Sequence, residues 1–186
     1  RGAVDKAKGD GVIYIGLIAD IQHADIDNGR SCYGAVRWYR DAVQKARLAA
    51  EDWAQMECAF AVNLGDTVDR RGVDAAAGLS RVLAAFGPFN GPVLHIPGNH
   101  DLSALPSDEV RRLNPAVAAK QLGAVLGGEG TSYCDIPVRP GWRVLVLDSY
   151  DIAVKRDAIA ARLFRAQALA DARARRAPHS NLTMHE

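Results

Sequence analysis

The sequence predicts an α/β fold built on a parallel sheet, because short apolar runs alternate with amphipathic helical patterns. Residues 12–18, 59–64 and 92–96 are apolar runs of strand length. Helical patterns separate the three runs, so right-handed crossovers would place these strands in one parallel sheet. A chain of 186 residues with 48% hydrophobic and 24% charged residues can bury the core of one such domain. We therefore expect a single domain over residues 1–186, without internal repeats.

Two helices are predicted between these strands. In the first, apolar side chains recur at spacings of three and four residues and form one buried face. These side chains are Val36, Tyr39, Val43, Ala46, Ala50 and Trp53. The second helix is predicted to begin after Asp74, whose carboxylate can cap it, and to end at Gly87-Pro88.

The part of the chain after the third strand is predicted to be less regular. Short helical pieces follow Pro106, and residues 131–136 and 143–147 have the pattern of two further strands. An Ala- and Arg-rich stretch over residues 157–176 has the composition of a helix with a solvated face. We expect a helical tail over residues 152–186.

Composition excludes several classes of protein. The formal net charge of +1 argues neither for nor against nucleic-acid binding, whereas no apolar run is long enough to span a bilayer. Cys32, Cys58 and Cys134 have the irregular spacing of reduced thiols rather than of a disulfide framework or zinc motif. The first residues lack a signal-peptide pattern. We expect a cytoplasmic protein with a small-molecule partner, no nucleic acid and no membrane; its oligomeric state is left open.

Three polar segments follow the first three predicted strands. They are Asp20-Ile21-Gln22, Gly65-Asp66-Thr67-Val68-Asp69-Arg70 and Gly98-Asn99-His100-Asp101. Ligands of open parallel sheets bind beyond the carboxyl ends of the strands, so the three segments should meet at one edge. Their side chains are therefore candidates for a common site.

The first two segments carry oxygen ligands suited to divalent cations. Asp20 and Gln22 are two residues apart, which turns both side chains to the same side of an extended chain. Gly65 allows a sharp exit from the strand, and Asp66 can then join two cations lying roughly 3.5–4 Å apart. Each segment alone is also compatible with a strand-end turn.

The third segment is the most specific of the three. Asn99 can give a carbonyl oxygen to a metal, while His100 can face a substrate as general acid or positive clamp. A structural histidine with a capping asparagine is the alternative for this segment alone. The occurrence of all three segments in this order favours a metal centre.

Together these segments resemble the pattern of the calcineurin-like metallophosphoesterases. Gln22 in place of the usual histidine, with Trp38-Tyr39-Arg40 and residues 146–151, is similar to the manganese-dependent ADP-ribose/CDP-alcohol diphosphatase branch. The resemblance covers residues 12–151. It implies a layered αββα sandwich of which this chain holds the N-terminal, parallel-sheet half.

The resemblance also implies a centre with two divalent metal ions. Asp20 and Gln22 would be ligands of one ion, Asp66 would bridge both, and Asn99 would bind the second. Manganese is the expected metal, with magnesium, iron and zinc as alternatives.

Catalytic roles follow from the same resemblance. His100 would lie near the scissile phosphate, Asp69 would orient it, and Arg70 would contact phosphate. A metal-bridging hydroxide would hydrolyse the phosphoanhydride of an ADP-ribose or CDP-alcohol type compound. The segment containing Arg70 is also similar to phosphoprotein phosphatases, so a phosphomonoesterase or protein phosphatase is the alternative.

The chain departs from this pattern in its histidines. The family has one later histidine in a Ser-His-x-Pro-like segment and two in a Gly-His-x-His motif, whereas only His179 and His185 follow His100 here. We therefore expect a truncated domain with an exposed apolar sheet face, weak metal binding and slow or absent turnover. An inactive remnant that serves as a binding module is a further alternative.

Overall fold

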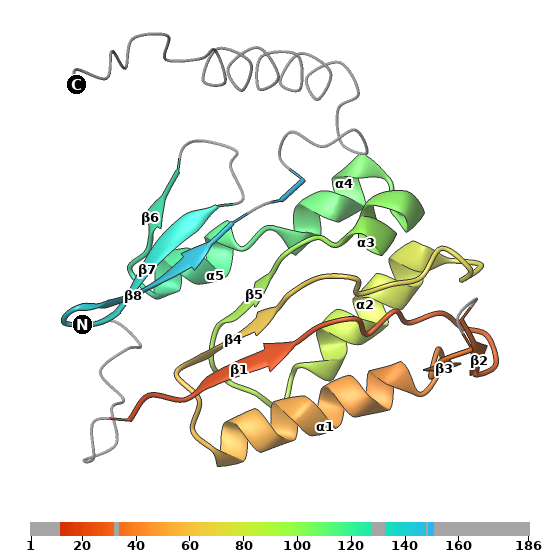
Figure 1. Cartoon of the computed structure of the whole chain (residues 1–186), viewed down its shortest axis with the longest axis horizontal. Coiled ribbons are helices and arrows are strands. Elements are labelled where there is room, and N and C mark those ends of the chain that lie inside the picture. Colours follow the sequence, from red (N-terminus) through yellow and green to blue (C-terminus); the bar gives the residue numbers. More distant parts are fainter. Residues whose placement is uncertain (1–11, 32–33, 128–132, 148, 151–186) are drawn as a thin grey trace, which may run out of the picture. The chain divides into compact units, whose positions relative to one another are not determined.

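A computed structural model describes residues 12–31, 34–127, 133–147 and 149–150 (Figure 1). The elements are, in chain order, β1 (Ile15–Ile18), β2 (Gly29–Arg30), β3 (Val36–Arg37), α1 (Ala42–Gln55), β4 (Phe60–Asn63), α2 (Ala75–Ala85), β5 (Val93–His95), α3 (Asn99–Ala104), α4 (Ser107–Val110), the 3-10 helix η2 (Arg111–Leu113), α5 (Ala116–Gln121), β6 (Val125–Leu126), β7 (Cys134–Arg139) and β8 (Trp142–Val146). All of them belong to one compact unit, residues 1–148.

The predicted parallel sheet is confirmed. Its strand order is β1-β4-β5, and both neighbouring pairs are parallel. Ile15 pairs with Phe60, and Val62 pairs with Leu94, so the three strands end at the same edge. The α/β class expected from the alternating pattern is therefore correct.

Helices α1 and α2 cover one face of this sheet (Figure 1). Trp53 of α1 stacks on Phe86 after α2, with ring centroids 5.7 Å apart, and meets Phe89 edge-on. A Cβ atom on Gly16 of β1 would lie 2.7 Å from the Trp53 indole, so glycine is what lets the helix approach the strand. The capping role predicted for Asp74 is confirmed, because its Oδ1 accepts the Ala77 N–H at 2.9 Å.

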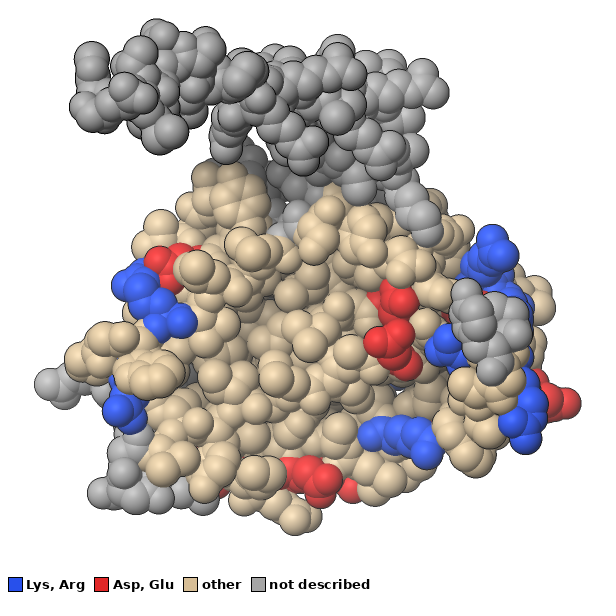
Figure 2. All heavy atoms as spheres, in the orientation of Figure 1, with Lys and Arg blue, Asp and Glu red and all other residues tan. Residues whose placement is uncertain are grey.

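The opposite face is covered by α5 and the antiparallel sheet β6-β7-β8, but only in part. Phe60, Leu94 and Ile136 are fully buried there, whereas Leu17 is 62% exposed and Leu64 is 50% exposed. Figure 2 shows this uncharged surface in the middle of the view, with Lys and Arg side chains toward its margins. The exposed apolar sheet face expected from the sequence is thus present.

The predicted first helix begins too early. It starts at Ala42, while Val36–Arg37 forms β3 and pairs with Gly29–Arg30 in a two-stranded antiparallel ribbon. Gly34, at φ +80°, supplies the left-handed turn that this ribbon needs. Helical spacing at Val36 and Tyr39 was therefore misleading, because backbone pairing across the ribbon determines the local structure.

The later strands were predicted with shifted ends. The strand predicted over residues 131–136 corresponds to β7, which begins at Cys134. No strand was predicted at the position of β6. The tail predicted over residues 152–186 lies outside the described residues. Within the described ranges, no helix combines the length and apolar character that a bilayer crossing requires.

Candidate metal centre

The first two polar segments are joined by backbone hydrogen bonds beyond the end of the sheet. The N–H groups of Asp20, Gln22 and His23 donate to the carbonyls of Gly65, Asp66 and Thr67, at 3.1, 2.7 and 3.0 Å. These bonds prolong the pairing of β1 with β4 past the regular strands. The first and second segments consequently form one continuous surface at the carboxyl edge of the sheet.

Three predicted ligands adopt a left-handed backbone conformation. Asp20, Gln22 and Asp66 have φ values of 54°, 46° and 55°. Residues other than glycine rarely adopt this region, and Asp is among those that tolerate it best. Such outliers concentrate at functional sites, where the surrounding hydrogen bonds hold them.

Gly65 and Gly98 bring the second and third segments into direct backbone contact. A Cβ atom on Gly65 would lie 2.7 Å from the Gly98 N and 2.8 Å from its Cα. A Cβ atom on Gly98 would overlap with the backbone N and Oδ1 of Asp66. Both glycines are therefore required for Asp66 to reach the start of α3.

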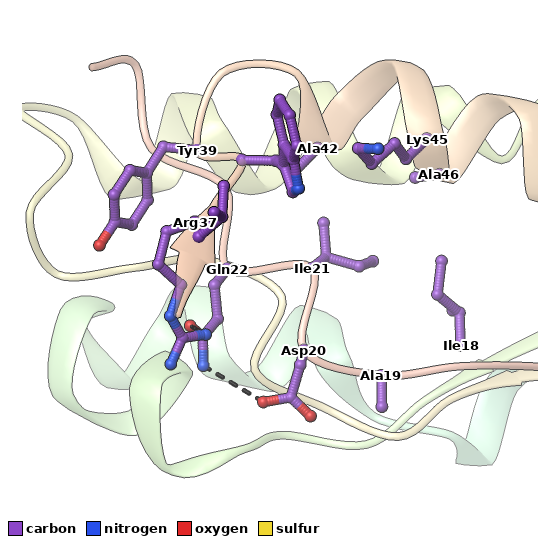
Figure 3. Close-up of a pocket in the computed structure, with 12 residues that line it drawn as sticks. Ile18, Ala19, Asp20, Ile21, Gln22, Arg37, Tyr39, Ala42, Lys45 and Ala46 are labelled. Carbon is purple, nitrogen blue, oxygen red and sulfur yellow. Dashed lines mark hydrogen bonds between the residues drawn. The ribbon is translucent and has the colours of Figure 1, made fainter. Parts of the chain in front are cut away.

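The Gln22 side chain contacts both predicted carboxylate ligands, and Figure 3 shows its hydrogen bond to Asp20. Its Nε2 donates to Asp20 Oδ1 at 3.3 Å and to Asp66 Oδ2 at 3.2 Å. Arg37, which was not among the predicted site residues, donates through Nη1 to Gln22 Oε1. Rotation of the amide would turn Oε1 toward the carboxylates, where a cation could accept it as a ligand.

The third segment approaches this centre through His100. Its backbone N–H donates to Asp66 Oδ1 at 2.9 Å, and its ring Nδ1 lies 3.1 Å from Asp69 Oδ2. The other Asp69 oxygen accepts the Arg71 N–H at 2.8 Å. Asp69 is buried and the His100 side chain is 30% exposed, so the ring reaches from a fixed carboxylate toward solvent.

The two remaining predicted site residues lie at the edges of this arrangement. Asn99 is the first residue of α3 and is half-buried beside His100. Arg70 is exposed in the turn that follows Asp69. The structure thus brings Asp20, Gln22 and Asp66 together most directly.

Tyr39 links the residues that follow the first segment to Arg71, which follows the second. Its carbonyl accepts the Ala24 N–H at 3.3 Å and pairs with His23 Nδ1 at 2.8 Å. Its hydroxyl accepts a hydrogen bond from Arg71 Nη1 at 2.7 Å. Sequence reasoning had placed Tyr39 on a helix face, and Arg71 had no assigned role.

Asp101 ties the second segment to the third. Its Oδ2 accepts the Gly98 N–H at 2.8 Å, and its Oδ1 accepts the Val68 N–H at 3.0 Å. Burial raises the pKa of the Asp101 carboxyl, while backbone N–H groups of Gly98, Val68 and Thr67 act in the opposite direction. The motif that contains Asp101 was recognised in the sequence, but this contact was not.

The donor set fits part of a divalent metal centre. Two carboxylates and two amide side chains, from Asp20, Asp66, Gln22 and Asn99, supply the oxygen ligands that manganese and magnesium prefer. Among the described residues no group of three or more His, Cys, Asp or Glu side chains could hold a metal ion. The described ligands therefore represent one side of such a centre.

A half-buried histidine, His95, lies beside Asn63, the last residue of β4 before the second segment. Asn63 Nδ2 lies 3.4 Å from His95 Nδ1 and donates to Thr67 Oγ1 at 2.9 Å, while Asn63 Oδ1 accepts the Gly65 N–H. Burial lowers the pKa of His95 from 6.5 to about 4. A protonated His95 would place two donors face to face and disturb the support of this loop.

We expect acid to destabilise the chain through His95. Its folded pKa lies below its unfolded value, so the unfolded state binds more protons between pH 6.5 and about 4. This stability is present above pH 6.5 and is lost as the pH falls toward 4. Urea unfolding at several pH values should show a smaller decline over this window for His95→Gln. Parallel declines for both proteins would contradict the assignment.

Comparisons with known proteins identify the family. The family model for calcineurin-like phosphoesterases matches residues 13–152. A manganese-dependent ADP-ribose/CDP-alcohol diphosphatase from Arabidopsis thaliana is 38% identical over 141 residues, covering 74% of this chain and 42% of the relative. A relative of the same name from Oryza sativa subsp. japonica is 30% identical and is covered over 46% of its length.

A solved structure shows the same fold. A dimetal phosphatase from Danio rerio superposes with a TM-score of 0.66 and 31% identity, covering 77% of this chain and 46% of that one. The chain thus spans about half the length of the relatives that it matches. The resemblance inferred from the polar segments is confirmed by a family match that covers most of the chain. The chain belongs to the calcineurin-like phosphoesterase family.

Proposed function

We propose that the protein is a manganese-dependent hydrolase of nucleoside diphosphate-linked compounds, of the ADP-ribose or CDP-alcohol type. The convergence of Asp20, Gln22 and Asp66 beside the His100–Asp69 pair carries this proposal. The names of the relatives, at 26–38% identity, support the substrate class and the metal. The Danio rerio dimetal phosphatase supports a pair of metal ions.

Asp20, Gln22, Asp66 and Asn99 would hold the metal ions. Bound manganese would supply Lewis acidity and activate water at neutral pH. The protein provides orientation, because the hydrogen bond from the His100 backbone N–H to Asp66 Oδ1 fixes the start of α3 against this carboxylate. Substrate phosphate would lie beside this carboxylate, within reach of the His100 ring.

His100 is proposed to hold the proton for the departing phosphate oxygen. With Asp69 Oδ2 accepting from Nδ1 at 3.1 Å, the ring orientation is set and Nε2 is the atom that can serve the substrate. Arg70, exposed at the rim, is the proposed phosphate contact.

A binding module without turnover is the second candidate. The absence of a group of three acidic, histidine or cysteine ligands among the described residues favours it. A reducing compartment such as the cytoplasm is proposed on separate grounds, because Cys134 is a buried free thiol.

Hydrolysis of three substrates in parallel tests the proposal. ADP-ribose, CDP-choline and a phosphopeptide should be incubated with the chain and MnCl2, and the products separated by chromatography. We expect slow release of AMP and CMP and no phosphate from the peptide. For His100→Gln, the rate of AMP and CMP release should be at least about 100-fold lower. Preferred cleavage of the phosphopeptide would favour a phosphatase, and Mn²⁺ binding without any cleavage would favour a binding module.

A further inference from the structure

Asp101 occupies an unusual place for a charged side chain. It is fully buried, with 0% exposure, yet it belongs to a short helix at the edge of the sheet. Its two oxygens accept N–H groups from different loops, Gly98 just before α3 and Val68 in the second segment. A buried carboxylate is costly unless it is fully hydrogen-bonded, so these bonds must persist for the residue to be tolerated.

Helix capping alone does not account for these contacts. The bond from the Gly98 N–H to Asp101 Oδ2 is the local bond that a residue in the first turn of a helix commonly makes. The Val68 N–H that Asp101 accepts lies 33 positions earlier in the chain, and a backbone hydrogen bond from Thr67 also favours the charged carboxylate. One carboxylate therefore connects two loops that carry different predicted ligands.

The connection lies next to Asp66 on both sides. Thr67 and Val68 follow Asp66 in the chain, and Gly98 is packed against its backbone. The Asp66 carboxylate in turn accepts the N–H of His100. Any change in the spacing of the two loops would consequently move Asp66 relative to α3.

We propose that Asp101 is a positioning residue, which holds the loop of residues 65–69 against the loop of residues 96–100 and so sets the placement of Asp66, Asn99 and His100. The proposal rests on the proposed metal-dependent function of these residues, but the contact it describes exists without a metal or substrate. Residues that orient ligands in this way typically contribute 10- to 100-fold to metal affinity, as an order of magnitude.

Asp101→Asn is the test, because it keeps the size of the side chain but turns one acceptor into a donor. The N–H of His100 is the informative probe, since Asp66 and not Asp101 accepts it. Hydrogen exchange at this amide should accelerate by about tenfold or more, while amides of α1 remain protected. Affinity for MnCl2 in isothermal titration should fall by about 10- to 100-fold.

Asp74→Asn is the matched control. It also removes a carboxylate that accepts a backbone N–H at a helix start, but this helix is α2. Because Asn caps a helix about as well as Asp, any change in exchange should be small and confined to the first turn of α2, and Mn²⁺ affinity should stay unchanged. An unchanged His100 amide in the Asp101→Asn variant would overturn the proposal.

Amide hydrogen exchange of the unsubstituted chain in low urea gives a second measurement, which does not depend on the folding of a variant. The amides of Val68, Gly98 and His100 should open as one unit with a common free energy, because one carboxylate joins their loops. Clearly different free energies of opening for these three amides would refute the proposed role of Asp101. Neither readout requires turnover, so a failure to hydrolyse ADP-ribose would count against the proposed function alone.

Discussion

Asp66→Asn is expected to lower the affinity of the chain for Mn²⁺ by more than about 100-fold, beyond the usual loss for a residue that only supports a ligand. The Asp66 side chain meets both neighbouring segments. Its Oδ2 accepts from Gln22 at 3.2 Å, and its Oδ1 accepts from the His100 N–H at 2.9 Å. An amide at this position halves the acceptor capacity and removes the charge that a bridging ligand supplies.

Isothermal titration with MnCl2 measures this effect directly. Asp52→Asn is a suitable control, because Asp52 is exposed on α1 and the substitution removes one negative charge as well. The control should bind manganese with the affinity of the unsubstituted chain. Equal affinities for Asp66→Asn and Asp52→Asn would show that the metal is bound elsewhere.

Gly98→Ala is expected to have the second large effect. The added methyl group would overlap with the backbone N of Asp66 and lie 2.9 Å from its Cα, so backbone rather than a flexible side chain must give way. Overpacking typically costs about 1–3 kcal/mol when side chains can adjust, and this substitution should reach the upper part of that range. Since the displaced residue is Asp66, Mn²⁺ binding should be lost together with stability.

Gly29→Ala separates this clash from a general effect of losing a glycine. A Cβ atom on Gly29 would be 3.7 Å from the Tyr39 ring, an ordinary contact. Chemical unfolding of both variants should show a marked loss for Gly98→Ala and little change for Gly29→Ala. A Gly98→Ala protein with unchanged stability and metal affinity would mean that the second and third segments are not in contact.

The fold could be predicted from the sequence because its main features are local. The apolar runs that became β1, β4 and β5 are short and separated by amphipathic helices, so few topologies are possible. Convergence of Asp20, Asp66 and His100 then followed from the common edge of parallel strands. The same reasoning failed at Val36, where helical spacing competes with pairing across a ribbon.

The supporting contacts of the site could not be predicted in the same way. Arg37 reaches Gln22 because β3 lies beside the first segment, and that strand had been assigned to a helix. Asp101 reaches Val68 across 33 positions, through a loop approach that depends on the absence of a Cβ at Gly98. The spacing of apolar residues carries no information on such contacts. Gly98, directly before Asn99, was the signal in the sequence that two backbones could pack closely here.

The left-handed backbone at Asp20, Gln22 and Asp66 has an evolutionary consequence. Each of these residues costs about 1 kcal/mol or more relative to glycine in the same conformation. Selection for stability alone would therefore replace them with glycine and erase the ligand set. The three positions thus give up stability of the fold for side chains that the proposed metal centre requires.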